Sequence, residues 1–262
     1  MIPITVVTGF LGSGKTSLIA HLLDSTQDRR IAVVVNELAA SSIDSAYLRG
    51  GEHYTMDDDP LLRSVSGGRS GAGKQSETID QLLQLTELSP PPEAIVVETS
   101  GSSPVADLTT EIERNSALRD RAELDSVITM IDVTSVGSYW KDPQLRMLLH
   151  DQLHGADLII LNKMDRSGFW MRRGALNLIK RNSNRSELVS AKFGQVPVEK
   201  VIATGRRSAR NAAINGSEQL SVISNPRFHP VVARQITEAR PFHPERLHYW
   251  LDADLPGIIR VK

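Results

Sequence analysis

The stretch GFLGSGKT, residues 9–16, carries the strongest fold signal in this chain. It follows an apolar, β-branched run over residues 4–9 and opens a helical pattern over residues 15–25. A glycine-rich turn between a strand and a helix lets backbone N–H groups converge on phosphate oxygens at the positive end of the helix. We expect Lys15 to meet the β and γ phosphates of a nucleotide and Thr16 to ligate Mg²⁺. The predicted nucleotide-binding residues of this loop are Gly9, Gly12, Ser13, Gly14, Lys15, Thr16 and Ser17.

Short β-branched runs alternate with helical patterns along the first 190 residues. The further expected strands are residues 31–36, 94–99, 126–132 and 157–163, and the further expected helices are residues 76–88, 104–120 and 143–155. The runs are almost continuously apolar, which is typical of parallel strands covered on both faces. The pattern predicts an α/β fold of the P-loop NTPase type, with a doubly wound, mostly parallel sheet. Ligands of such sheets bind at the carboxyl ends of the strands.

The stretch LNKMD ends the fifth expected strand and supplies Asn162, Lys163 and Asp165. In an Asn-Lys-x-Asp arrangement the aspartate accepts hydrogen bonds from the ring N1–H and the exocyclic amine of guanine. Adenine offers neither donor in that geometry, and an unpaired buried carboxylate makes the mismatch costly. We therefore predict GTP and GDP as ligands, with an ATPase as the alternative.

The stretch IVVETSG places Glu98 at the end of the third expected strand and Gly101 three residues later. A carboxylate in this place holds the Mg²⁺ shell, and the glycine lets a backbone N–H approach the γ-phosphate. We assign catalytic roles to Lys15, Thr16 and Glu98. The rival carboxylate, Asp132, has no following glycine, so we interpret it as a loop anchor.

Composition excludes several classes of function. The 262 residues have a formal net charge of −1 and 40% hydrophobic content, so we expect neither a nucleic-acid nor a membrane partner. The basic cluster at 205–210 is interpreted as a solvated face. The sequence contains no cysteine, which excludes disulfides and thiolate metal sites and fits a reducing, cytoplasmic location.

These motifs together resemble the CobW-type GTPases, relatives of HypB and UreG. The resemblance also covers VVNE ending in Glu37, VVETSG followed by Pro104, ADLIILNKMD, and ARPFHPERLHYWL at residues 239–251. It implies an α/β GTPase domain followed by a small C-terminal α+β domain. It further implies slow GTP hydrolysis coupled to handling of zinc or cobalt for a client metalloprotein. The predicted metal ligands are Thr16 and Glu98, assigned to Mg²⁺ above, together with Glu37 at the end of VVNE.

The chain departs from the family pattern in two places. Members usually carry a C-x-C-C motif after the long loop, where this chain has SGGRSGAGK with Arg69, Gly71 and Ala72. Members also often have NEFGE where this chain has NELAA, so that Ala40 replaces an acidic residue. We therefore expect a divergent member without the cysteine motif. The expected domains are a GTPase domain (1–202), an irregular linker (203–238) and the start of a truncated or reduced C-terminal domain (239–262).

The stretch SGGRSGAGKQ, residues 66–75, imitates a second phosphate loop. It has Gln75 where Mg²⁺ needs a hydroxyl, and residues 57–65 before it make a poor strand. We therefore expect no second nucleotide site there. Ser190, Ala191 and Lys192 match a Ser-Ala-Lys loop that braces guanine, and this assignment stays open.

Two other sets of residues have ligand chemistry. His53 with Asp57, Asp58 and Asp59 offers an imidazole and carboxylates, but DDDP is also typical of a solvated turn. His150 and His154 are four residues apart on one helical face and are interpreted as core or surface histidines. A GTP-gated protein-binding module with no transition-metal role is the alternative function.

Overall fold

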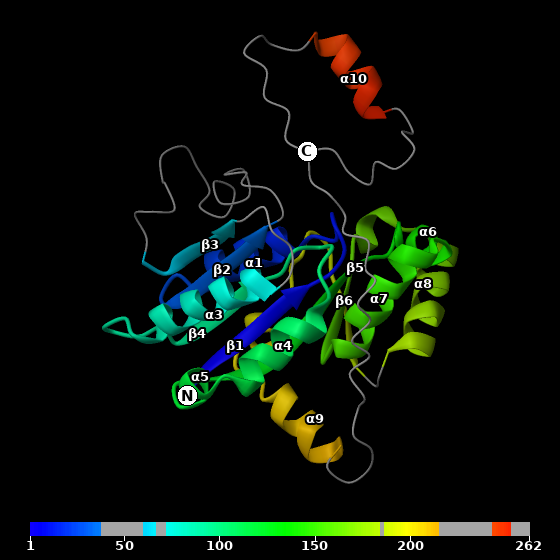
Figure 1. The fold of residues 1–262 in the computed structure, drawn as a ribbon. Coiled ribbons are helices and arrows are strands. Elements are labelled where there is room, and N and C mark those ends of the chain that lie inside the picture. Colours follow the sequence, from blue (N-terminus) through cyan, green and yellow to red (C-terminus); the bar gives the residue numbers. More distant parts are fainter. Residues whose placement is uncertain (38–59, 67–71, 184–185, 215–242, 253–262) are drawn as a thin grey trace.

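The computed structural model describes residues 1–37, 60–66, 72–183, 186–214 and 243–252. Its centre is a seven-stranded sheet in the order β3-β2-β4-β1-β5-β6-β7, and every pair of neighbouring strands is parallel (Figure 1). The strands are β1 (Ile2–Thr8), β2 (Ile31–Glu37), β3 (Leu62–Ser66), β4 (Ala94–Glu98), β5 (Ala122–Asp132), β6 (Leu158–Asn162) and β7 (Glu187–Ser190). The doubly wound parallel sheet predicted from the sequence is confirmed.

Helices connect these strands and cover the sheet. They are α1 (Lys15–Ser25), α3 (Ala72–Thr86), α4 (Val105–Arg114), α5 (Ser116–Arg119), α6 (Val136–Lys141), α7 (Pro143–Gly155), α8 (Phe169–Asn182), α9 (Arg206–Ile214) and α10 (Pro244–Asp252). Two short 3₁₀ turns, η2 (Met164–Arg166) and η3 (Val198–Lys200), complete the described elements. None of the described helices is both long and apolar enough to cross a membrane.

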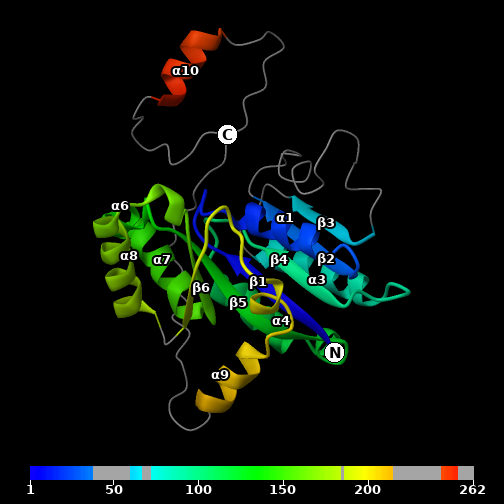
Figure 2. The same ribbon diagram turned by 180° about the vertical axis from the view of Figure 1, so that it is seen from behind.

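Apolar side chains fill the space on both faces of the sheet. All five residues of β4 and all five of β6 are buried, as continuous burial of a parallel strand requires. On one face Val7, Val33 and Ile160 pack with α1. On the other face α3, α4 and α5 cover the middle strands, and α6, α7 and α8 cover β5 and β6. Figure 2 shows this second helical group at one end of the sheet and β3 at the other.

The prediction of a poor strand before the second glycine stretch is wrong for its last residues. β3 pairs in parallel with β2, from Val33 opposite Leu62 to Glu37 opposite Ser66. Leu62 and Val65 are buried. The other side chains of β3 are polar, so main-chain pairing with β2 at the sheet edge stabilises the strand. The stretch 66–75 thus follows a strand and precedes α3, while residues 67–71 lie outside the described part. The exclusion of a second nucleotide site stays a prediction, now based on Gln75 alone.

Two further expectations need correction. The helix expected over 104–120 is divided at Asn115, whose side chain accepts a hydrogen bond from the Leu118 N–H at 3.0 Å and caps α5. The segment 203–214 is not irregular, because it contains α9. The domain boundaries themselves stay predictions.

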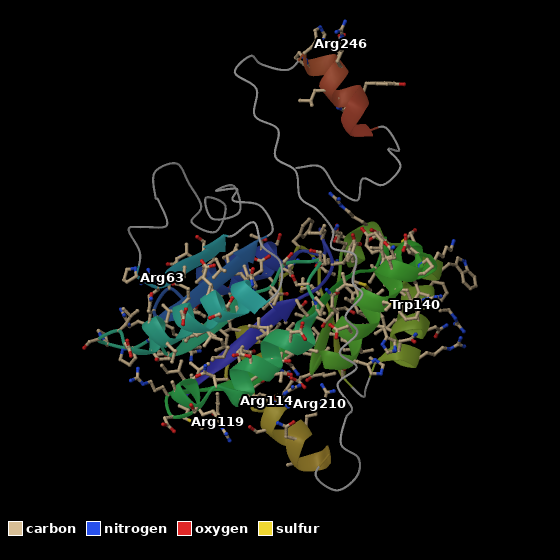
Figure 3. The ribbon with its side chains drawn as sticks, in the orientation of Figure 1. Arg63, Arg114, Arg119, Trp140, Arg210 and Arg246 are labelled. Carbon is tan, nitrogen blue, oxygen red and sulfur yellow. The ribbon has the colours of Figure 1, made fainter. Side chains whose placement is uncertain are left out.

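The basic cluster at 205–210 is also not a solvated face. Arg206 pairs with Glu187 at 2.8 Å, and Arg207 pairs with Glu113 at 2.8 Å. Arg210 on α9 donates to three carbonyl groups at the end of α7 and to the Asp157 carboxylate at 3.0 Å (Figure 3). These arginines attach α9 to the amino ends of β6 and β7 and to the end of α4.

Candidate functional site at the carboxyl ends of the strands

The predicted phosphate loop joins β1 to α1. Gly9, Gly12 and Gly14 have φ values of 134°, 77° and 105°, a region that L side chains rarely adopt. A Cβ atom on Gly9 would overlap the Met130 carbonyl oxygen, and one on Gly14 would overlap the Asn162 side-chain amide. Glycine is therefore required at both positions for the loop to close against β5 and β6.

Lys15 is buried at the first position of α1. Its Nζ donates to the carbonyl oxygen of Gly9 at 2.9 Å and reaches that of Phe10 at 3.5 Å. These contacts hold the ammonium group across the loop. A cation held there attracts the anionic oxygens of a phosphate chain.

Thr16 and Glu98 face each other across the gap between α1 and β4. The Thr16 hydroxyl donates to the two Glu98 carboxylate oxygens at 3.2 and 3.4 Å, and Glu98 is buried. A hydroxyl and a carboxylate are the hard oxygen ligands that Mg²⁺ prefers, so this donor set fits the ion. Glu37 is the last residue of β2, but its side chain lies outside the described part of the chain.

Gly101 lies directly against the phosphate loop. A Cβ atom on Gly101 would come within 2.7 Å of the Leu11 nitrogen, so only glycine permits this approach. The hydrogen bond from Thr99 N–H to the Val7 carbonyl, at 2.9 Å, aligns the segment after β4 with the end of β1. The structure thus brings together the phosphate loop, Glu98 and Gly101.

Three buried hydroxyl groups around this loop have no hydrogen-bond partner among the described residues. They belong to Thr8, Ser13 and Thr99. All three lie at the carboxyl ends of β1 and β4 or within the phosphate loop. An unpartnered buried hydroxyl is costly unless a ligand or water satisfies it, which is the state expected of a binding pocket.

Asn162 joins the phosphate loop to the segment after β7. Its Nδ2 donates to the Ser13 carbonyl oxygen at 2.9 Å, and its Oδ1 accepts from the Gly194 N–H at 3.1 Å. Gly194 in turn packs against α1, where an added Cβ would lie 2.7 Å from the Leu18 nitrogen. In this arrangement Asn162 positions two loops.

Lys163 forms an ion pair that sequence reasoning missed. It has φ 60°, and its Nζ lies 2.6 Å from the Asp132 carboxylate. Asp132 also accepts from the Thr134 N–H at 2.9 Å and hydroxyl at 2.6 Å, as expected of a loop anchor. Burial by itself would raise the pKa of Asp132, but the hydrogen bonds from Lys163 and Thr134 outweigh it and hold the pKa below its ordinary value.

Asp165 lies on η2, and its side chain is 24% exposed. Its described ion pair, to Arg166, is long at 3.9 Å. The adjacent Met164 N–H donates to the Ala191 carbonyl oxygen at 3.3 Å, which places the Ser-Ala-Lys segment beside Asp165. The Arg172 guanidinium fastens the same turn to α8, donating to the Met164 carbonyl at 2.6 Å and to the Ser167 carbonyl at 2.8 Å. The NKxD motif gives no signal for Gly194 or Arg172, which the fold brings to it.

The alternative metal ligands do not form a site in the described residues. His150 and His154 stack with their ring centroids 4.0 Å apart, and burial followed by the charge of His154 lowers the pKa of His150. Within the described ranges no group of three or more histidine, cysteine, aspartate or glutamate residues is arranged to hold a metal ion. His53 and residues 57–59 lie outside these ranges.

Comparison with known proteins agrees with this geometry. The family model described as CobW/HypB/UreG, nucleotide-binding domain, matches residues 3–187. A zinc chaperone CobW of Sinorhizobium sp is 30% identical over 226 residues, which cover 78% of this chain and 63% of that protein. The zinc-regulated GTPase metalloprotein activator 1 of Dictyostelium discoideum is 28% identical over 298 residues, which cover 100% of this chain and 62% of the relative. This chain therefore spans less than two thirds of the length of these relatives.

Among solved structures, zinc-bound YjiA GTPase from Escherichia coli superposes with a TM-score of 0.53 at 22% identity, over 78% of this chain and 62% of that one. A zinc-bound triple mutant of YjiA gives a TM-score of 0.56 at 23% identity, with the same coverage. At this identity the likeness shows a shared fold.

Proposed function

The chain belongs to the CobW/HypB/UreG family of nucleotide-binding domains, and from this premise we propose that it is a Mg²⁺-dependent, slow GTPase. In this proposal it acts as a nucleotide switch for metal-ion handling, with a client metalloprotein as partner and the cytoplasm as its compartment. The observation that carries the proposal is the Asn162 bridge, which ties the phosphate loop at Ser13 both to the end of β6, three residues before Asp165, and to the segment at Gly194.

Each residue of the pocket has a defined task. Lys15 and the backbone N–H groups of residues 12–17 bind the β and γ phosphates, and Asp165 accepts hydrogen bonds from guanine. Thr16 and Glu98 would hold Mg²⁺, which neutralises charge that develops on the phosphate oxygens. The three sequence motifs that build the pocket contain no arginine to stabilise the transition state further. We therefore propose unassisted turnover at roughly 10⁻² s⁻¹ or below.

Base selection gives a direct test. Fluorescent GDP bound to the chain should be displaced by GDP at least a hundredfold more effectively than by ADP. In Asp165→Asn the amide donates to the C2 carbonyl of xanthine but repels the amine of guanine, so the variant should prefer XDP to GDP. Asp120→Asn, an exposed aspartate at the end of α5, is the matched control and should keep the GDP preference. Equal displacement by ADP and GDP in the natural chain would refute guanine specificity.

The metal role of this chain requires ligands other than thiolates. The CobW relative of Sinorhizobium sp is named a zinc chaperone, whereas this sequence has no cysteine. We propose that any zinc or cobalt is held by imidazole and carboxylate groups, which bind these ions without sulfur. Titration of Zn²⁺ or Co²⁺ with GTP and with GDP should show stoichiometric binding that depends on the nucleotide.

The second candidate is a GTP-gated protein-binding module with no transition-metal role. The lack of any cysteine favours it. The same titration separates the two functions, because this module would bind GDP and GTP but neither metal ion at micromolar concentration.

A further inference from the structure

We propose that the first turn of α8 is a docking surface for an acidic segment of a protein partner. Phe169, Trp170 and Met171 are adjacent in the sequence and are 66%, 79% and 46% exposed. Phe169 and Trp170 pack edge to face with ring centroids 5.3 Å apart. Single exposed apolar residues are ordinary, but three large ones together mark an interaction site. Tryptophan and arginine are the residues most enriched where protein interfaces gain their affinity.

The charges around this turn specify the partner. Between Asp165 and Glu187 every charged residue is basic, in a chain whose net charge is −1. Of the described basic residues in this stretch, Arg166, Arg172 and Arg173 lie within four residues of Phe169 or Trp170, whereas Lys180 and Arg181 lie in the last turn of α8. Arg166 is largely exposed, and its contact with Asp165 is weak at 3.9 Å. A partner segment that carries aspartate or glutamate beside an apolar residue complements both features.

A membrane surface fits less well. Helices that lie on membranes carry an apolar stripe along their whole length. In α8 the apolar side chains beyond the first turn face the core, where Ala175 and Ile179 are buried. The exposed apolar area is thus confined to one end of the helix. Figure 2 shows α8 at the outer end of the sheet beside α7, away from β3.

Arg172 links this surface to the base-reading turn. Its guanidinium donates to the carbonyl oxygens of Met164 and Ser167 and to the Ser167 hydroxyl, so η2 and the first turn of α8 form one hydrogen-bonded unit. A nucleotide that orders Asp165 therefore also orders the residues around Phe169 and Trp170. This coupling rests on the proposed guanine-nucleotide site, whereas the docking surface itself does not.

The test uses a labelled 14-residue peptide with glutamate at most positions and leucine or phenylalanine at every third or fourth. Its anisotropy is titrated with the full chain, beside a copy in which lysine replaces each glutamate. We expect micromolar binding of the acidic peptide and none of the basic copy. Trp170→Ala and Arg173→Glu should each weaken binding at least tenfold. Tyr249→Ala, which removes an 81% exposed aromatic residue of α10, is the matched control and should change nothing.

Each other outcome overturns the proposal. No binding of the acidic peptide at 500 µM, or equal binding by Trp170→Ala with an unchanged circular dichroism spectrum, removes the surface. The chain is also titrated with phosphatidylglycerol vesicles and with single-stranded DNA. If either binds more tightly than the peptide and the binding depends on Trp170, the surface belongs to a lipid or nucleic-acid partner instead.

Fluorescent GDP binding, measured on the same samples, keeps the two proposals apart. If the natural chain does not bind GDP, the nucleotide site is refuted, but the docking surface is not affected. With GDP bound, peptide affinity should change at least threefold in the natural chain and less in Arg172→Lys. An unchanged affinity in the natural chain would refute the coupling alone.

Discussion

Three buried hydroxyls at the carboxyl edge of the sheet and two buried carboxylates near its amino edge differ in how well they are paired. At the carboxyl ends of the strands the buried hydroxyls of Thr8, Ser13 and Thr99 have no partner among the described residues. Near the amino ends Asp125 accepts three hydrogen bonds from Thr204 and Gly205, which attach the segment before α9. The three hydroxyls have no partner within the described residues, whereas the carboxylate of Asp125 holds two segments of the chain together.

This contrast predicts different consequences of mutation for paired and unpaired polar groups. Removal of one partner from a buried ion pair leaves an uncompensated charge and therefore destabilises the fold. A polar group that awaits a ligand contributes little until the ligand binds. Mutations at the amino edge should therefore change unfolding, and mutations at the carboxyl edge should change nucleotide binding or turnover.

The largest effect is expected at the amino edge, from Asp157→Ala. The Asp157 side chain is 2% exposed and accepts from the Val127 N–H at 2.9 Å and from Arg210 at 3.0 Å. Its loss leaves the guanidinium groups of Arg207 and Arg210 without their shared buried carboxylate, at a cost of about 3–5 kcal/mol in the free energy of unfolding. Urea denaturation measures this cost. The affinity for GDP should stay the same in the folded variant.

Glu187→Ala is the control for that variant. Glu187 pairs with Lys200 and Arg206, but its side chain is 39% exposed, so its loss should cost about 1 kcal/mol or less. Equal destabilisation by the two variants would contradict the distinction between saturated buried pairs and surface pairs.

The next effect is expected at the carboxyl edge, from Lys15→Ala. Removal of the cation that meets the phosphates should lower the GTP hydrolysis rate about 10²–10³-fold and weaken GTP binding. Phosphate release under single-turnover conditions gives the rate. Lys141→Ala, at the exposed end of α6, is the matched control, and hydrolysis by Lys15→Ala at the natural rate would disprove the site assignment.

Asp132→Asn should have an intermediate effect. The variant removes the charge that holds Lys163 at 2.6 Å, an interaction of about 1.5–3 kcal/mol, so the Kd for GDP should rise roughly tenfold to a hundredfold. Fluorescent GDP titration measures it, with Asp120→Asn as the acid-to-amide control. An unchanged Kd would show that Asp132 anchors its own loop only.

The smallest effect is expected from Asp151→Asn. Burial raises the pKa of Asp151, although its carboxylate accepts from the Val105 N–H at 2.8 Å. A raised pKa in the folded state means that the protonated carboxyl favours folding, and that this contribution is lost as the pH rises through the folded pKa. Asparagine keeps the acceptor without the charge, so at pH 7 the variant should be as stable as the natural chain or more stable, by about 1 kcal/mol or less.

Thermal unfolding of the natural chain and of Asp151→Asn, measured from pH 7 down to pH 4, tests this difference in stability. The advantage of Asp151→Asn should shrink as the natural carboxyl becomes protonated. If the stability advantage of Asp151→Asn instead grew toward low pH, the sign would be wrong and the raised pKa of Asp151 would be contradicted.

The sequence was sufficient for the elements whose signal is local. The phosphate loop and α1 are predicted to the residue at 15–25, because glycine spacing and helical periodicity are properties of neighbouring residues. The strand β3 was missed, because LRSVS has little apolar character and forms by pairing with β2. The anchored α9 was missed as well, since the partners of its arginines lie on β7, on α4 and at the start of β6.

Local chemistry in the chain thus specified the loop that needs positive φ, the buried strands and the exclusion of thiolate metal sites, and it predicts that Asp165 reads the base. The fold alone assigned Asn162 to Ser13, 149 residues away, Lys163 to Asp132, 31 residues away, and Arg210 to Asp157, 53 residues away. The reason is physical. Propensity and spacing act along the chain, whereas a hydrogen bond is fixed by strand order and register, which bring distant residues to the same edge of the sheet.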